Sequence, residues 1–184
     1  MQPHTALTLL LCLAATGTAG ESFDLGKFTR EATELILYSI VPAQLMEMDE
    51  HGNPTAAEKR KEKLHGYPVL GKIAATTPAI KAAMRDALLS ALQPELRAPE
   101  APNMCFQPRH AICLKQGSQH VDVLLCFECG NAKVRYLKPW ADKSWSQEEA
   151  LIDISDKGLD ALNRLLDARG IQRDLPKSKA PPKR

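Results

Sequence analysis

Apolar and polar residues alternate along the chain from Arg109 onward, and this period of two predicts β-strands. Two strands joined by a two-residue turn at Gly117-Ser118 place one set of apolar side chains on a single face: Ile112, Leu114, Val121, Val123, Leu125 and Phe127. This register puts Arg109 opposite Cys126 and Cys113 opposite Asp122. The pattern therefore predicts a β-hairpin with one buried face.

A second hairpin, turning at Gly130-Asn131, would extend the same face. It would place Val134 opposite Phe127 and Arg135 opposite Cys126. Because two turn signals agree on one apolar face, we expect a three-stranded meander at about 109–137.

Other periodic segments predict the rest of the fold. Short apolar runs indicate strands near 35–41 and 67–73, with a helix from Thr29 as the alternative for the first. Thr77-Pro78 is typical of a helix start, and we expect a helix at about 78–92. Ser146 with Glu149 forms a capping-box pattern, so helices are expected at about 147–169, before Gly170. The predicted fold is α+β: a small antiparallel sheet covered by these helices.

The two ends of the sequence differ from the middle. Residues 1–20 run from an apolar stretch into small residues, which is the layout of a secretory signal peptide containing Cys12. The segment 176–184 is basic and rich in proline, so we expect a disordered tail. Residues 21–175 are then a single exported domain, located in the periplasm or outside the cell, with no transmembrane segment.

Composition and charge narrow the function only slightly. The chain is 44% hydrophobic and 25% charged, as in globular proteins. Its net charge is +2, but four basic residues lie in the 176–184 tail, so residues 21–175 carry 20 basic against 22 acidic groups. A nucleic-acid partner is therefore not expected.

The four cysteines of the mature chain are the most distinctive candidates for chemistry. In an oxidising compartment they can form disulfides, and we expect Cys105 to bridge to Cys129 or Cys126, with Cys129 favoured. Cys113 lies too far along the hairpin to reach them, at about 13 Å from Cys126. We expect it to be buried as a small apolar residue.

Two alternative hypotheses use the same cysteines. Cys126-x-x-Cys129-Gly130 resembles half of a zinc knuckle, with Cys105 and His110 as the nearest further ligands, although His110 and Cys126 should face opposite sides of the sheet. Thiol redox chemistry is the other alternative, because Arg109 and Arg135 on either side of Cys126 would lower the pKa of its thiol.

The element Cys105-Phe-Gln-Pro-Arg-His110, followed by Cys126-Phe-Glu-Cys129, carries a resemblance. Together with the segments 37–40 and 65–72, it resembles a group of uncharacterised exported bacterial proteins. That resemblance covers roughly residues 35–137 and implies a shape but no activity.

Motifs of common enzyme classes are absent from the sequence, including the nucleophile elbow, the phosphate-binding loop and the His-Glu-x-x-His zinc motif. His120 and Asp122 lie close on one strand and are expected to be exposed. We therefore expect a non-catalytic module that binds another protein. Such a module would be of the inhibitor, immunity or envelope-assembly type, would be reinforced by a disulfide and would need no cofactor. The alternative is a thiol-redox or zinc protein acting through Cys126 and Cys129.

Overall fold

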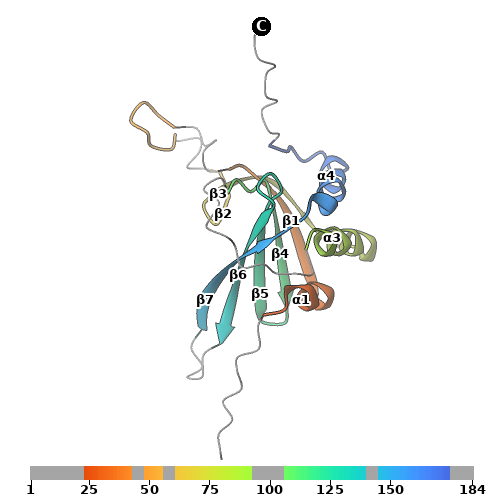
Figure 1. The fold of residues 1–184 in the computed structure, drawn as a ribbon. Coiled ribbons are helices and arrows are strands. Elements are labelled where there is room, and N and C mark those ends of the chain that lie inside the picture. The colour runs from red at the N-terminus through yellow and green to blue at the C-terminus, as the bar shows by residue number, and fades with distance from the viewer. Residues whose placement is uncertain (1–22, 43–47, 56–60, 93–105, 140–144, 175–184) are drawn as a thin grey trace, which may run out of the picture.

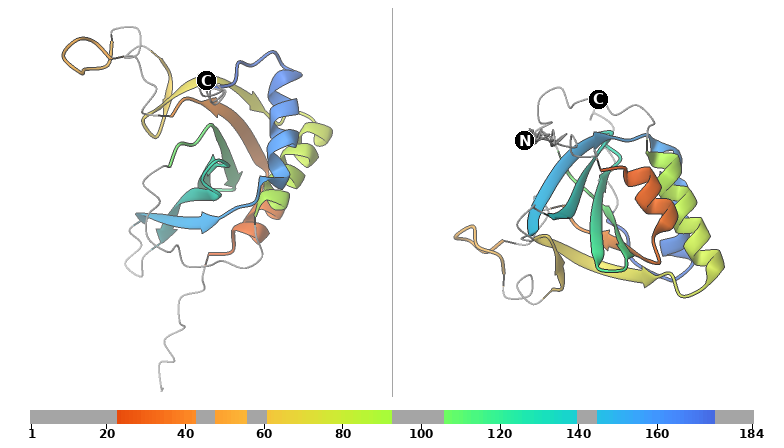
Figure 2. Two further views of the ribbon diagram at one scale, coloured as in Figure 1. Left: turned by 45° about the horizontal axis from the view of Figure 1, so that its top comes forward. Right: turned by 90° about the horizontal axis from the view of Figure 1, so that it is seen from below.

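The computed structural model describes residues 23–42, 48–55, 61–92, 106–139 and 145–174. Within these residues, seven antiparallel strands form one sheet in the order β2-β3-β1-β4-β5-β6-β7. The sheet curves into a half-barrel, and the helices pack together on one side of it (Figures 1 and 2). None of the helices described here is long and apolar enough to cross a bilayer.

The strands are β1 (Glu34–Ile40), β2 (Lys63–Leu64), β3 (Tyr67–Ala74), β4 (His110–Gln116), β5 (Gln119–Cys126), β6 (Asn131–Pro139) and β7 (Trp145–Asp153). The helices are α1 (Leu25–Glu31), α3 (Pro78–Ala91), the short 3₁₀ helix η2 (Asp156–Gly158) and α4 (Leu159–Asp167).

The elements with the strongest sequence signals are confirmed. Strands β4 and β5 pair in the predicted register, with His110 opposite Leu125 and Cys113 opposite Asp122. Helix α3 begins where expected, and the Thr77 hydroxyl accepts a hydrogen bond of 3.3 Å from the Ile80 N–H. Gly170 follows α4 with a φ of +65°, the conformation that glycine adopts after a helix end.

The main core lies between the sheet and the helices. It contains the predicted apolar residues of the meander and the buried residues of the three α-helices, among them Phe28, Met84, Leu88, Leu162 and Leu166. A smaller cluster of Ile40, Ala111 and Leu124 lies on the opposite face of the sheet. The alternation of strand side chains thus gives both faces of the central strands an apolar part.

The face away from the helices is concave. His65, in the turn between β2 and β3, contacts Asp122 on β5, although β1 and β4 lie between β3 and β5 in the sheet. In a flat sheet, β3 and β5 would be about 14 Å apart. The contact therefore requires strong curvature, and we call this concave side the inner face of the half-barrel.

The predicted fold class is wrong. A small sheet covered by helices is not what forms, because strands predominate over helices among the described residues and the seven strands found there make a half-barrel. The order of strands explains the difference, since β1 inserts between β3 and β4 and joins the meander to the earlier hairpin. These pairings are long-range, and local periodicity does not specify them.

The helix expected at the start of 147–169 is also wrong, because Trp145–Asp153 is the edge strand β7. The Ser146 and Glu149 pattern fits a strand equally well. Glu149 pairs with Arg135 across the ladder, while Ile152 on the alternate face enters the core. Nine pairs with β6 override the helix propensity of this segment. Helix α1 was not predicted, although Asp24 caps it through the Lys27 N–H.

The register of the second hairpin differs from prediction by four residues. Residues 127–130 form the turn, so Cys126 pairs with Asn131 and Asp122 pairs with Arg135. Because the difference is an even number, Val134 and Tyr136 still face the helices. The predicted apolar face is therefore correct, but Arg135 does not lie opposite Cys126.

Candidate functional site

The cysteines singled out from the sequence lie at one end of the meander. Cys126 is the last residue of β5 and is buried, whereas Cys129 lies in the following turn and is partly exposed. Their sulfur atoms are 2.7 Å apart without being bonded. The Gln107 N–H donates a hydrogen bond to Cys126 Sγ at 3.3 Å. Cys105 falls outside the described residues, so its predicted disulfide to Cys129 stays a prediction.

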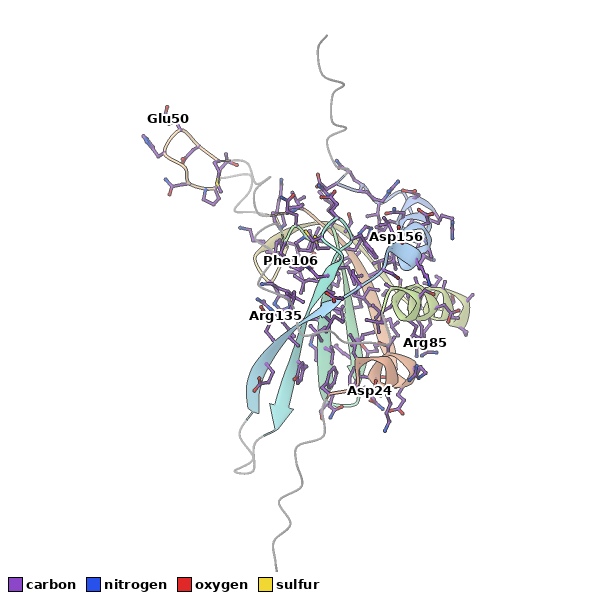
Figure 3. All side chains as sticks on the ribbon, in the orientation of Figure 1. Asp24, Glu50, Arg85, Phe106, Arg135 and Asp156 are labelled. Atoms are coloured by element: carbon purple, nitrogen blue, oxygen red, sulfur yellow. The ribbon has the colours of Figure 1, made fainter. Side chains whose placement is uncertain are left out.

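The two arginines expected beside Cys126 are each engaged by carboxylates. Arg109 forms ion pairs with Glu128, at 3.1 Å, and with Asp174. Arg135 bonds Glu149 at 2.6 Å and lies on the side of the sheet away from the helices (Figure 3). Because Arg135 pairs with Asp122 and not with Cys126, the prediction that Cys126 lies between two arginines is wrong.

His110 faces the helices, as the sequence register required. Its Nε2 lies 2.9 Å from Asn163 Oδ1 on α4, so it cannot share a metal ion with Cys126 on the other face. Burial lowers the pKa of His110 to about 4, with Arg173 and Arg109 acting in the same direction and the bond to Asn163 opposing them. His110 is thus a neutral imidazole at neutral pH.

A cavity of about 410 Å³ adjoins His110 on this helix-covered side. Its walls include Leu125, Phe127 and Leu159, and the Phe127 ring meets the imidazole edge-on at 5.7 Å. Nδ1 of His110 is buried and has no hydrogen-bond partner within the described residues. The exposed surface of the cavity is mainly apolar, but its wall also contains the neutral His110 imidazole and charged residues that include Arg109, Arg173 and Asp174.

A second group of polar side chains gathers on the inner face around Asp122. Oδ2 of Asp122 lies 2.6 Å from His65 Nε2, and Oδ1 lies 2.7 Å from His120 Nε2. Cys113 sits opposite Asp122 on the neighbouring strand. The ligand atoms of Cys113, His120 and Asp122 all lie within 4.8 Å of one another.

Asp122 is the buried centre of this cluster. Its side chain is only 11% exposed, compared with 44% for His120 and 20% for His65. Despite the nearby His120, Oδ1 makes no hydrogen bond of acceptable geometry with any described residue. The prediction that Asp122 is exposed is wrong, and that for His120 is confirmed. A buried carboxylate oxygen without a hydrogen bond is costly unless another positive partner approaches it.

Cys113 is buried, as predicted, but it has polar neighbours. Its thiol lies next to the Asp122 carboxylate and the Tyr38 hydroxyl. Burial and, next, the Asp122 charge raise the pKa of the Cys113 thiol. Burial also raises the pKa of Tyr38 to about 12, with Cys113 adding to that effect. Without a bound cation, this thiol is protonated at neutral pH.

His65 reaches Asp122 because of an unusual backbone conformation. Its φ is +50°, and it is followed by Gly66 at +87°, in a two-residue turn closed by the Leu64 and Tyr67 pair. Two successive positive φ angles define a type I′ hairpin turn, which suits glycine but not most other residues. The strained conformation at His65 places its ring over the inner face, where it holds one oxygen of Asp122.

This donor set matches the ligands of zinc. Thiolate, imidazole and carboxylate all bind Zn²⁺ at about 2.0–2.3 Å, so tetrahedral ligand atoms lie about 3.3–3.8 Å apart. Since the three atoms here lie within 4.8 Å of one another, shifts of about 1 Å would bring them to that spacing. His65 would then fix the orientation of the Asp122 ligand, as a carboxylate or histidine partner does in many metal sites.

No family model, curated protein or solved structure matches this chain. The resemblance to exported bacterial proteins therefore stays a prediction. The cluster on the inner face also has no counterpart from which a role could be transferred.

Sequence reasoning missed this cluster although part of its signal was present. The predicted register already placed Cys113 opposite Asp122, with His120 two residues away on the same face. His65 comes from a hairpin 57 residues earlier in the chain, and only the curvature of the sheet brings it to Asp122.

Proposed function

We propose that this protein is an exported metal-binding protein whose half-barrel holds one divalent transition-metal ion of the zinc type. Cys113, His120 and Asp122 supply three ligands from two adjacent strands, and His65 positions Asp122. The observation that carries the proposal is the convergence of three ligand atoms, from Cys113, His120 and Asp122, which all lie within 4.8 Å of one another around a buried carboxylate.

The chemistry of the donors selects the class of metal. A thiolate is a soft ligand and an imidazole is of intermediate softness, so both favour Zn²⁺, Co²⁺ or Cu²⁺ over Mg²⁺ and Ca²⁺, which require oxygen ligands. Three protein ligands leave a fourth position open, as in zinc sites that bind a water molecule or a small ligand.

Binding to another protein, the function expected from the sequence, stays a prediction. No described surface feature favours a particular protein partner over the metal. The metal proposal uses different residues from the zinc knuckle considered at Cys126 and Cys129. The proposed site has three converging ligands, whereas the zinc knuckle at Cys126 and Cys129 has two, and the metal proposal therefore replaces the knuckle hypothesis.

Metal titration of the reduced, chelator-treated full chain tests the proposal. We expect one Zn²⁺ to bind per chain by calorimetry, and Co²⁺ to give the near-ultraviolet absorption band of a cobalt–thiolate bond. His120→Ala should weaken Zn²⁺ binding at least tenfold, because it removes one of the three ligands. The His120 side chain is substantially exposed, so the fold should tolerate this change. His65→Ala should weaken binding by about 10- to 100-fold while keeping one ion per chain.

Cysteine variants separate this site from the other thiols. Cys113→Ser should abolish the cobalt–thiolate band, whereas the matched variant Cys129→Ser should leave it unchanged. Loss of the band in Cys129→Ser with retention in Cys113→Ser would place the metal at the other cysteines and refute the proposal. Absence of Zn²⁺ binding by the unmodified chain would mean that His65, Asp122 and His120 form only a hydrogen-bonded network, and would also refute it.

A further inference from the structure

The metal proposal makes no use of Cys126 and Cys129, yet the turn between them is closely defined. The Cys129 N–H donates to the Cys126 carbonyl at 3.2 Å, and the Gly130 N–H donates to the Phe127 carbonyl at 3.3 Å. Gly130 has a φ of +67°, and Asn131 already pairs with Cys126 in the ladder. This network holds the two sulfur atoms 2.7 Å apart.

The two thiols differ in their access to solvent. Cys126 is only 1% exposed, and its sulfur receives the Gln107 N–H, whereas Cys129 lies in the turn and is partly exposed. An external disulfide can therefore reach Cys129 more easily than Cys126. Access of one thiol together with proximity of the second is the arrangement that thiol–disulfide exchange requires.

We propose that Cys126 and Cys129 are a reversible dithiol–disulfide couple that exchanges with a disulfide of another molecule. The Cys129 thiolate attacks one sulfur of that disulfide, breaks its S–S bond and forms a mixed disulfide while one thiolate leaves. The Cys126 thiolate then attacks the Cys129 sulfur and expels the second thiolate. The protein loses two electrons and two thiol protons, and the external disulfide gains them as two thiols.

Proximity drives this couple, in contrast to the thiolate stabilisation expected from the sequence. Arg109, the cation expected to act on Cys126, is paired with the carboxylates of Glu128 and Asp174. Once Cys129 carries the mixed disulfide, the Cys126 thiolate attacks that disulfide far faster than a separate thiol would, because no translational freedom is lost in this step.

The couple is separate from the metal site. Cys113 pairs with Asp122, which lies four residues along β5 from Cys126, or about 13 Å at 3.3 Å per residue. A disulfide requires Cα atoms within about 7 Å, so Cys113 cannot join the couple. The redox proposal can therefore fail without affecting the metal proposal, and the reverse also holds.

Peptide mapping after equilibration in glutathione buffers tests the couple. Trypsin cuts after Lys115 and Lys133, so Cys126 and Cys129 fall in one peptide, 116–133, whereas Cys113 falls in 110–115 and Cys105 in 98–109. After alkylation of the free thiols, we expect the oxidised form of peptide 116–133 to be unalkylated. Its fraction should rise and fall with the ratio of glutathione disulfide to glutathione in the folded, full chain.

Three outcomes would overturn the proposal. These are full alkylation of peptide 116–133 at every ratio, a crosslink between peptides 98–109 and 116–133, and a bridge that is reduced only after unfolding. Cys113→Ser is the matched control and should titrate like the unmodified protein. Cys129→Ser should leave Cys126 alkylated under all conditions once the protein is unfolded for labelling.

Discussion

At the scale of single residues, the burial of His110 predicts how the free energy of unfolding depends on pH. Its pKa of about 4 in the folded protein lies below the value of about 6.5 for an unfolded histidine. Between these values the unfolded chain binds a proton that the folded chain does not. The free energy of unfolding should therefore decrease as the pH falls through this window, by about 2 kcal/mol from pH 7 to pH 4.5.

Urea unfolding of His110→Gln at both pH values checks this expectation. The variant lacks the titrating group, so its loss of stability between pH 7 and pH 4.5 should be smaller than that of the unmodified protein by the same amount. His51→Gln removes an imidazole from an exposed loop and should behave like the unmodified protein. An unchanged pH dependence in His110→Gln would contradict the burial of a neutral His110.

Sequence alone places some of these residues correctly. Alternation along β4 and β5 puts Cys113 opposite Asp122 and His110 on the helix-covered face, because side chains alternate strictly along a strand. The same alternation misplaces Arg135, because it does not determine how many residues form the turn after Cys126. The burial of Asp122 depends on His65, whose approach no local pattern indicates.

At the scale of elements, Gly158 brings η2 close against α3. A Cβ added there would lie 2.2 Å from the Ala87 carbonyl oxygen and 3.2 Å from the Ala91 Cβ. Because backbone atoms would have to move, Gly158→Ala should reduce the free energy of unfolding by about 1–3 kcal/mol. Chemical denaturation measures this loss.

Gly26→Ala in α1 is the control for the same substitution. The nearest atoms to its added Cβ belong to the side chains of Asp24 and Arg30, at 3.3 Å or more. Alanine is also the better helix former, so this variant should be neutral or slightly more stable. Equal losses in the two variants would contradict a specific contact between η2 and α3.

Elements with two independent signals are the ones that sequence predicts well. Helix α3 has both a capping threonine and helical spacing, and the β4–β5 hairpin has both a turn and an alternating face. Strand β7 was assigned to a helix because a serine and a glutamate three residues apart suit either structure. Its pairing with β6 makes this segment a strand. Such pairing depends on two segments, so the sequence of one segment alone does not reveal it.

At the scale of the whole molecule, export is the expectation that is simplest to test. The apolar stretch and the small residues before Glu21 lie outside the described residues, so cleavage near Gly20 stays a prediction. Intact-mass measurement of the protein from a secreting host should show a chain without Met1 and Cys12. A mass that includes these residues would contradict export by a cleaved leader.

The half-barrel itself could not be predicted from the sequence. Its curvature and strand order follow from β1 pairing with β3 on one side and β4 on the other, across segments with no shared local signal. The disordered tail predicted at 176–184 lies outside the described residues.

The central position of β1 also sets the order in which the chain can assemble. A nascent chain that has emerged only as far as α3 contains β1 and β3 but not β4, so one edge of β1 has no strand to pair with. Leu35 and Leu37 of β1, which are buried in the finished protein, then lack their neighbours on β4, Leu114 and Ile112. Ribosome-bound chains that end before residue 110 should therefore associate through this unpaired, apolar strand and be sensitive to proteases. The sheet can close only after β4 has been synthesised.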